Sequence, residues 1–393
     1  MPLSTRMPRA RGCLLGLAIG DALGAPLEGL SAQQIRAHYE LVTGYVDGAT
    51  AWKRKPYRWR MPGLYTDDTQ QALALADVLI QRGRVDIDLL AETYLALANP
   101  KGSYVGAHRG VGRSFRQVLA DLERGVSPRH TGTDSAGIGA AMRIAPVAIY
   151  FAEEPERLFD AVMDASLMTH RDVRSIAAAM AVAYGIRRLL GGEDLEPSFL
   201  FRVAGDVQKA EARIASEYPG LVTSIGNHGR AMSSAIAHAE KLVDLPRDRA
   251  FGALVEEANR HGAEPTCRRP TMGFPPALIP TCLFMLVTTE TFEEAILEIV
   301  NLGGDADTAG AILGALAGAH FGDEAIPDRF LDGLKNRTGV SLRAEAMVRR
   351  DSRSAGIPDL VKTEHDLSRQ EESCRGELLA QRQGGDLGAN RKS

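Results

Sequence analysis

Two short acidic clusters, far apart in the chain, contain the residue types best able to do chemistry. The first runs from Thr66 to Thr69 (Thr-Asp-Asp-Thr), and the second runs from Gly303 to Thr308 (Gly-Gly-Asp-Ala-Asp-Thr). Each offers two carboxylates and a hydroxyl, and all-oxygen ligands suit hard cations such as Mg²⁺, Mn²⁺ or Ca²⁺. Four carboxylates carry more charge than one such ion usually needs, so a pair of divalent ions would use them better.

Each cluster also precedes an apolar run, so helix capping is the simpler explanation of either one alone. A cap needs a single oxygen, however, and each cluster supplies several. A calcium-binding EF-hand loop is excluded for the second cluster, because counting Asp305 as position one puts Leu316 where the loop requires Glu. Two acidic helix starts facing each other, with metal ions offsetting their charge, explain the redundancy better than two separate caps.

Two further acids lie near the N-terminus. Asp21 belongs to the run from Leu14 to Leu23, which is apolar almost all round, so the carboxylate must be buried with a partner that it caps or bridges. Glu28 follows Pro26, beyond the expected helix end. It is either an exposed loop residue or a functional acid.

Glycine-rich segments precede two other helical runs. These are the segments from Gly110 to Ser114 and from Ser135 to Arg143. Backbone N–H groups at such positions can hold phosphate oxygens, although neither segment matches a P-loop or a dinucleotide-binding fingerprint. Close helix packing is the alternative. His170, before the run from Ser175 to Leu190, is either a substrate contact or a cap or surface residue.

The periodic segments are helical and convincing strands are scarce, so we predict an all-α fold. The predicted helices are Leu14 to Leu23, Gln70 to Ile80, Leu89 to Leu97, Phe115 to Leu122, Ile138 to Phe151, Ser175 to Leu190 and Thr308 to Phe321. Long loops are expected over 43–62, 99–112, 127–139 and 264–280. Because the composition becomes polar near residue 341, we predict one domain over 9–340 and a flexible extension over 341–393.

Composition narrows the class of protein. The chain has 393 residues and a net charge of −4, so no basic field indicates nucleic acid or an anionic membrane. The four cysteines form no C-x-x-C pair, which favours reduced thiols. The apolar run after Cys13 is short and interrupted by Asp21, so we predict a buried helix, not a signal sequence, and no stretch approaches the ~20 apolar residues of a membrane span. We expect a cytoplasmic protein and a monomer.

These motifs, in this order, resemble the ADP-ribosylglycohydrolase family, which includes the dinitrogenase-reductase-activating glycohydrolases and the ADP-ribosyl-acceptor hydrolases. The resemblance covers about Arg11 to Asn336 and is most specific in the two acidic clusters. It implies a single large, compact orthogonal helical bundle of that family's type. It also implies a centre of two Mg²⁺ or Mn²⁺ ions, with ligands Thr66, Asp67, Asp68, Asp305, Asp307 and Thr308.

The resemblance implies a substrate in which ADP-ribose is attached to a protein side chain, often arginine or serine. Glu28 is then the expected catalytic acid/base, with Asp67 or Asp305 assisting a water that attacks C1″ of the ribose. The expected substrate contacts are Gly110, Gly112, Ser135, Gly137, Gly139, Met142, His170 and Phe274.

Two positions depart from the family pattern. Relatives often carry Asn where this chain has Ile138, and some carry Tyr in the region of Phe274. Two alternatives to the leading prediction therefore stay open. The chain could hydrolyse another ADP-ribose derivative or nucleotide-sugar bond, or it could be a catalytically silent ADP-ribose-binding member.

Overall fold

The structure, a computed structural model, describes residues 3–98, 106–223, 228–351 and 356–389, with no side chains described for 222–223 and 381–389. Within these ranges the chain forms nineteen α-helices and no named strand, which confirms the predicted all-α class. The helices are α1 (Leu3–Gly24), α2 (Ala32–Tyr39), α3 (Asp67–Arg82), α4 (Ile87–Ala98), α5 (Arg113–Glu123), α6 (Gly139–Met142), α7 (Ala145–Tyr150), α8 (Pro155–Leu167), α9 (Val173–Leu190), α10 (Ser198–Glu217), α11 (Pro219–Thr223), α12 (Ala231–Glu240), α13 (Arg247–Arg260), α14 (Pro275–Thr288), α15 (Phe292–Asn301), α16 (Ala306–Phe321), α17 (Asp328–Gly333), α18 (Arg337–Arg349) and α19 (Leu360–Ala389).

One predicted helix was wrong in its continuity. The run from Ile138 to Phe151 is divided into α6 and α7, and Arg143 and Ile144 lie between them. Pro146 lies in the first turn of α7, where its missing N–H costs no helical hydrogen bond, whereas it would break a helix that continued from α6. The predicted loop over 99–112 is described only from residue 106 onward, and its earlier part lies outside the described residues.

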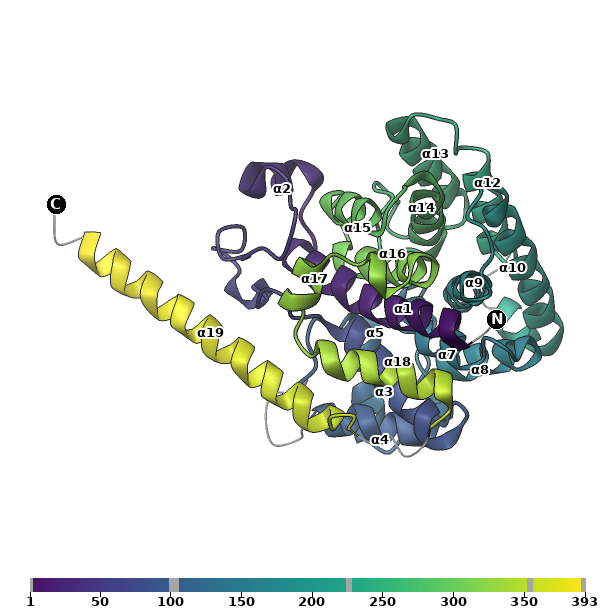
Figure 1. The fold of residues 1–393 in the computed structure, drawn as a ribbon, viewed down its shortest axis with the longest axis horizontal. Coiled ribbons are helices and arrows are strands. Elements are labelled where there is room, and N and C mark those ends of the chain that lie inside the picture. The colour runs from purple at the N-terminus through teal and green to yellow at the C-terminus, as the bar shows by residue number, and fades with distance from the viewer. Residues whose placement is uncertain (1–2, 99–105, 224–227, 352–355, 390–393) are drawn as a thin grey trace.

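Helices α1 and α16 cross the middle of the molecule side by side (Figure 1). Glycines spaced four residues apart on α1 face small residues on α16, in antiparallel order: Gly12 opposite Gly318, Gly16 opposite Gly314, Gly20 opposite Gly310, and Gly24 opposite Ala306. A Cβ atom added to Gly20 would lie 1.9 Å from the Gly310 carbonyl oxygen, so no larger side chain fits. This close contact brings the C-terminal end of α1 to the N-terminal end of α16.

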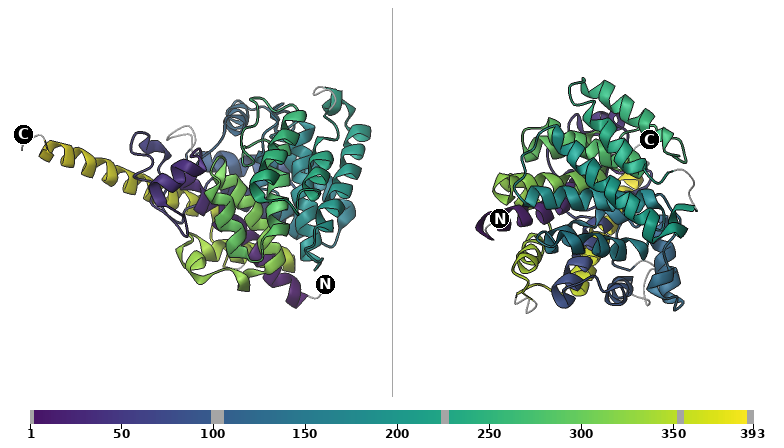
Figure 2. Two further views of the ribbon diagram at one scale, coloured as in Figure 1. Left: turned by 90° about the horizontal axis from the view of Figure 1, so that it is seen from above. Right: turned by 90° about the vertical axis from the view of Figure 1, so that its right-hand side faces the viewer.

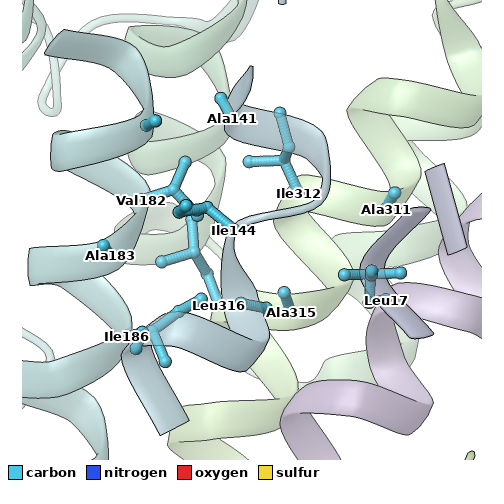
Figure 3. Packing of buried hydrophobic residues seen from close by; sticks show 14 of the residues in the cluster. Leu17, Ala141, Ile144, Val182, Ala183, Ile186, Ala311, Ile312, Ala315 and Leu316 are labelled. Atoms are coloured by element: carbon cyan, nitrogen blue, oxygen red, sulfur yellow. The ribbon is translucent and has the colours of Figure 1, made fainter. Parts of the chain in front are cut away.

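The core continues from this pair into α9 and the turn between α6 and α7. In Figure 3, Leu17 of α1 lies beside Ala311 and Ala315 of α16, and Leu316 on the same helix lies beside Val182 of α9 and Ile144. These side chains are fully or almost fully buried. The apolar support behind the N-terminal ends of α3 and α16 is therefore dense, and it fixes where their first turns point.

Helix α1 also explains the apolar N-terminal run. Residues 3–27 are long and apolar enough to pass a test for a membrane span, so the prediction that no stretch approaches that length was too strict. In the structure, however, 94% of the most apolar 18-residue stretch of this helix is buried inside the protein. The helix is packed as a core element, as predicted for this segment.

The C-terminal region forms regular elements as well. Helix α18 spans the predicted boundary at residue 340, and Arg343 on it is buried and pairs with Asp77 of α3 at 2.7 Å. Helix α19 begins against α3 and α4, and its later turns extend away from the other helices, as Figures 1 and 2 show. The division of the chain into a domain and a flexible extension stays a prediction.

Candidate active site

The end of α1, the start of α3 and the start of α16 meet around one cavity of about 380 Å³. Both acidic clusters line this cavity, together with Glu28 and the two glycine-rich segments. The cavity residues are Glu28, Gly29, Arg58, Asp67, Asp68, Gln71, Gly110, Gly112, Arg113, Ser114, Phe115, Gly137, Ile138, Gly139, Met142, Arg143, His170, Gly273, Gly304, Asp305, Asp307 and Thr308. Segments about 240 residues apart in the sequence thus form one site, as the paired-cluster hypothesis expected.

Asp21 fixes the first turn of α3 from the neighbouring helix. Its Oδ1 accepts hydrogen bonds from the backbone N–H and the hydroxyl of Thr66, both at 2.8 Å, and its Oδ2 accepts from the N–H at 3.0 Å and the hydroxyl at 2.6 Å of Thr69. Asp21 is fully buried, as predicted, and it supplies the cap that the acids of α3 do not. Asp67 and Asp68 are therefore not used as caps and can face the cavity.

The turn before α16 is held against the Glu28 segment. Gly303 and Gly304 have positive φ angles of 68° and 78°, a conformation that favours glycine. The Gly304 N–H donates to the Leu30 carbonyl at 2.8 Å, and the Gly29 N–H donates to the Gly304 carbonyl at 2.6 Å. These bonds place Glu28, which is half-buried, beside the acidic turn at the edge of the cavity.

The carboxylates in the cavity are buried near like charges. Burial, followed by the charges of Asp21 and Glu28, raises the pKa of Asp67 to about 8. Burial and the charge of Glu28 raise the pKa of Asp305 to about 6. The pKa values of Asp68 and Asp307 are also raised, mainly by burial, and a hydrogen bond from Thr308 partly opposes this for Asp68. The cavity is therefore lined by fewer positively charged side chains than carboxylates.

The donor set fits divalent cations by chemistry and by burial. Asp68 Oδ1 and Asp307 Oδ1 are buried and have no hydrogen-bond partner among the described residues, an uncommon and costly state for a carboxylate oxygen. No three described His, Cys, Asp or Glu side chains, on the other hand, stand at the mutual spacing of a ready-made metal site. The expected ligand set also includes the hydroxyls of Thr66 and Thr308, so the unpartnered oxygens of Asp68 and Asp307 remain the observation that favours a cation.

The opposite wall of the cavity consists of the glycine-rich segments. Gly110 lies so close to the acidic turn that a Cβ atom on it would be 3.1 Å from Asp67 Oδ1. Gly139, at the start of α6, leaves a similar gap of 2.8 Å to His170 Cε1. Burial lowers the pKa of His170 to about 3, so its ring stays neutral near pH 7. This wall offers backbone N–H groups and a neutral imidazole instead of carboxylates.

The structure places most of the predicted site residues in this cavity, with three exceptions. Thr66 is buried behind the cavity, where its hydroxyl lies 3.3 Å from Asp68 Oδ2. Ser135 and Phe274 line a second chamber of about 690 Å³, which shares Gly137 and Gly273 with the first. The predicted substrate contacts therefore belong to two adjoining chambers.

Sequence reasoning missed the polar residues that support the acids from behind. Gln71 donates to Asp67 Oδ2 at 3.0 Å and accepts from Arg143 Nη1 at 2.7 Å. Arg143 also donates to Thr169, whose hydroxyl lies 2.8 Å from His170 Nδ1. The detectable signal was weak, because it consisted of one Gln four residues after Asp67 and one Arg within an apolar run.

Comparison with known proteins gives consistent results. A family model described as ADP-ribosylglycohydrolase matches residues 2–356. The ADP-ribosyl-[dinitrogen reductase] glycohydrolase of Rhodospirillum rubrum is 27% identical over 86% of this chain and 94% of its own length. The ADP-ribosylarginine hydrolase Tri1 of Serratia proteamaculans is 27% identical over 88% of this chain and 81% of its own.

Among solved structures, one titled ADP-ribosylglycohydrolase-related protein complex is similar in both sequence and fold. It aligns with a TM-score of 0.63 at 28% identity, and the alignment covers 88% of this chain and 99% of the other.

Proposed function

The chain belongs to the ADP-ribosylglycohydrolase family, and we propose that it is a divalent-cation-dependent hydrolase that removes ADP-ribose from modified protein side chains. One observation carries the cation dependence. Two buried carboxylate oxygens, from Asp68 and Asp307 of the same cavity lining, have no hydrogen-bond partner among the described residues. A pair of Mg²⁺ or Mn²⁺ ions held by Thr66, Asp67, Asp68, Asp305, Asp307 and Thr308 would satisfy them.

The two walls of the cavity have different proposed roles, since one would hold the ions and the other would hold the diphosphate of the substrate. Bound ions would supply the positive charge that orients the ribose hydroxyls and activates water. Glu28, at the cavity edge, is placed to move the proton between water and the departing side chain. Backbone N–H groups at the starts of α5 and α6 are suited to the diphosphate, and the neutral His170 ring adds a polar contact without adding charge.

The second chamber is suited to the part of the substrate farther from the scissile bond. Phe274 there offers an aromatic face, which Arg174 already contacts, with its guanidinium carbon 5.5 Å from the ring centroid. A purine could stack on that aromatic surface. Ile138 lines the first chamber with an apolar side chain where relatives often have a polar one.

The linkage is the finer part of the proposal. Two relatives carry names that specify ADP-ribosylarginine or ADP-ribosylated dinitrogen reductase, so arginine-linked ADP-ribose is the first substrate to test. The assay measures free ADP-ribose released from arginine-linked and serine-linked peptides with Mg²⁺, Mn²⁺ or EDTA. Cation-dependent release from the arginine peptide is the expected result. ADP-ribose binding with no release from either peptide would favour the two alternatives, which are hydrolysis of another ADP-ribose derivative or nucleotide-sugar bond and a silent binding protein.

A further inference from the structure

Helix α19 lies beyond the part of the chain that the family model matches, yet two of its polar side chains, Glu364 and Ser368, are buried against α3 and the loop before α5. Glu364 is fully buried and pairs with Arg109 at 2.5 Å, where both side chains are almost inaccessible. It also accepts hydrogen bonds from Tyr65 at 2.5 Å and Gln70 at 2.8 Å. A carboxylate desolvated this far is retained only with such a complete set of partners.

The Arg109 end of this network belongs to the loop that forms one wall of the cavity. Ser368 of α19 accepts from Arg109 Nη1 at 2.9 Å and donates to the Ala107 carbonyl at 2.8 Å. The Arg109 N–H donates to Gln70 Oε1 at 3.0 Å. The next residue along the chain is Gly110, where an added Cβ atom would lie 3.1 Å from Asp67 Oδ1. Two loop residues, Arg109 and Gly110, therefore connect α19 to the acidic site.

A second set of contacts, about two turns farther along α19, reaches the segment that carries Arg58, another residue of the cavity lining. The buried Glu371 accepts from the Met61 N–H at 3.2 Å, and Arg375 donates to the Trp59 carbonyl at 3.3 Å. These residues end the 43–62 loop. Within that loop Arg58 lines the cavity and donates to the Glu28 carbonyl at 3.1 Å.

We propose that α19 is a positioning clamp that holds the 106–113 loop through Glu364 and Ser368, and the 58–61 segment through Glu371 and Arg375. Because the two loops carry Gly110, Gly112 and Arg58, the clamp sets the width of the substrate cleft. The inference deepens the proposed function and rests on it for its effect on ADP-ribose. The clamp itself is a property of the free protein.

The test compares Glu364→Gln and Glu371→Gln in the full-length chain with Glu372→Gln, which makes the same change on an exposed part of the same helix. Hydrogen exchange of the backbone amides is measured without ligand. Glu364→Gln is expected to speed exchange in 106–113, and Glu371→Gln in 58–61, while the control changes neither. Unchanged exchange in both loops, or a uniform increase over the whole chain, would overturn the clamp.

Binding and turnover then connect the clamp to function. We expect Glu364→Gln to weaken binding of free ADP-ribose by roughly tenfold and to raise KM more than it lowers kcat. If Glu364→Gln does not fold, Ser368→Ala replaces it, because this change removes one hydrogen-bond pair and leaves the ion pair. Faster loop exchange with unaltered ADP-ribose affinity would reject the role in substrate binding. A wild-type protein that binds no ADP-ribose would reject the proposed function, while the exchange data still decide on the clamp.

Discussion

Asp21 and Asp68 are both buried carboxylates at the N-terminal end of α3, but their environments are opposite. Asp21 accepts four hydrogen bonds from Thr66 and Thr69, whereas Asp68 has an oxygen without a partner among the described residues. Both oxygens of the Asp21 carboxylate are used to cap α3. Asp68 keeps unused ligand capacity and faces like charges from Asp67 and Asp305.

The comparison shows how the fold separates stability from chemistry. A protein that ties its helix ends together with Asp21, and its loops with Glu364, can leave other acids unpaired at the same helix terminus. Unpaired acids destabilise the protein on their own, so their presence indicates a partner outside the chain.

Asp307→Ala removes a proposed metal ligand whose carboxylate has an oxygen without a hydrogen-bond partner among the described residues. We expect hydrolysis of the arginine-linked peptide to fall by roughly 1,000-fold and Mn²⁺ binding to weaken in parallel. The rate and the Mn²⁺ affinity are measured on the same preparation. Asp328→Ala, which changes an exposed acid at the start of α17, is the matched control and should leave both intact. Retained Mn²⁺ affinity in Asp307→Ala would remove this residue from the ligand set.

Glu28→Gln tests whether the half-buried acid at the cavity edge takes part in proton transfer. We expect kcat to fall about 100-fold, the usual scale for loss of a general acid or base, with little change in ADP-ribose affinity. Steady-state kinetics and calorimetry separate the two quantities. Equal turnover in the wild-type protein and the variant would eliminate Glu28 from the mechanism, and Glu92→Gln on the exposed face of α4 serves as control.

Asp21→Asn changes the carboxylate that has hydrogen-bond partners on both oxygens. The amide NH₂ group would face donors from Thr66 or Thr69, leaving hydrogen bonds unmade inside the protein, so we expect a loss of about 2 kcal/mol in the free energy of unfolding. Urea denaturation measures the loss. Asp68→Asn in chelated protein is expected to cost less stability, because relief of the repulsion from neighbouring carboxylates offsets the weakened hydrogen bonds from Thr66 and Thr308. Equal destabilisation by both changes would mean that the two acids do not differ in kind.

The pH dependence of stability sharpens the same contrast. The folded-state pKa values of Asp67 and Asp305, about 8 and about 6, lie above the ordinary value of 3.8. The folded state therefore binds more protons than the unfolded state between those limits, and chelated protein should lose at least about 1 kcal/mol as pH rises from 5 to 8. Urea midpoints with EDTA and with Mn²⁺ at both pH values check this. A loss that Mn²⁺ does not reverse would contradict the assignment.

The site was more predictable than its surroundings. The two acidic clusters indicated where two helix starts would meet, because each supplies more oxygens than a helix cap needs. Ser135 and Phe274 were assigned to the same site, but loop geometry places them in an adjoining chamber. The docking of α19 was not predictable, since Glu364 is buried by polar partners and hydrophobic periodicity gives no sign of such contacts.

We propose that the buried acids Asp67, Asp68, Asp305 and Asp307 form a site for two cations. Titration of the chelated protein with Mn²⁺, with unbound Mn²⁺ followed by electron paramagnetic resonance, measures the number of ions bound per chain. We expect two bound Mn²⁺ ions per chain in the wild-type protein, fewer in Asp307→Ala, and two in Asp328→Ala. A wild-type protein that binds no Mn²⁺ and releases ADP-ribose equally well in EDTA would contradict it.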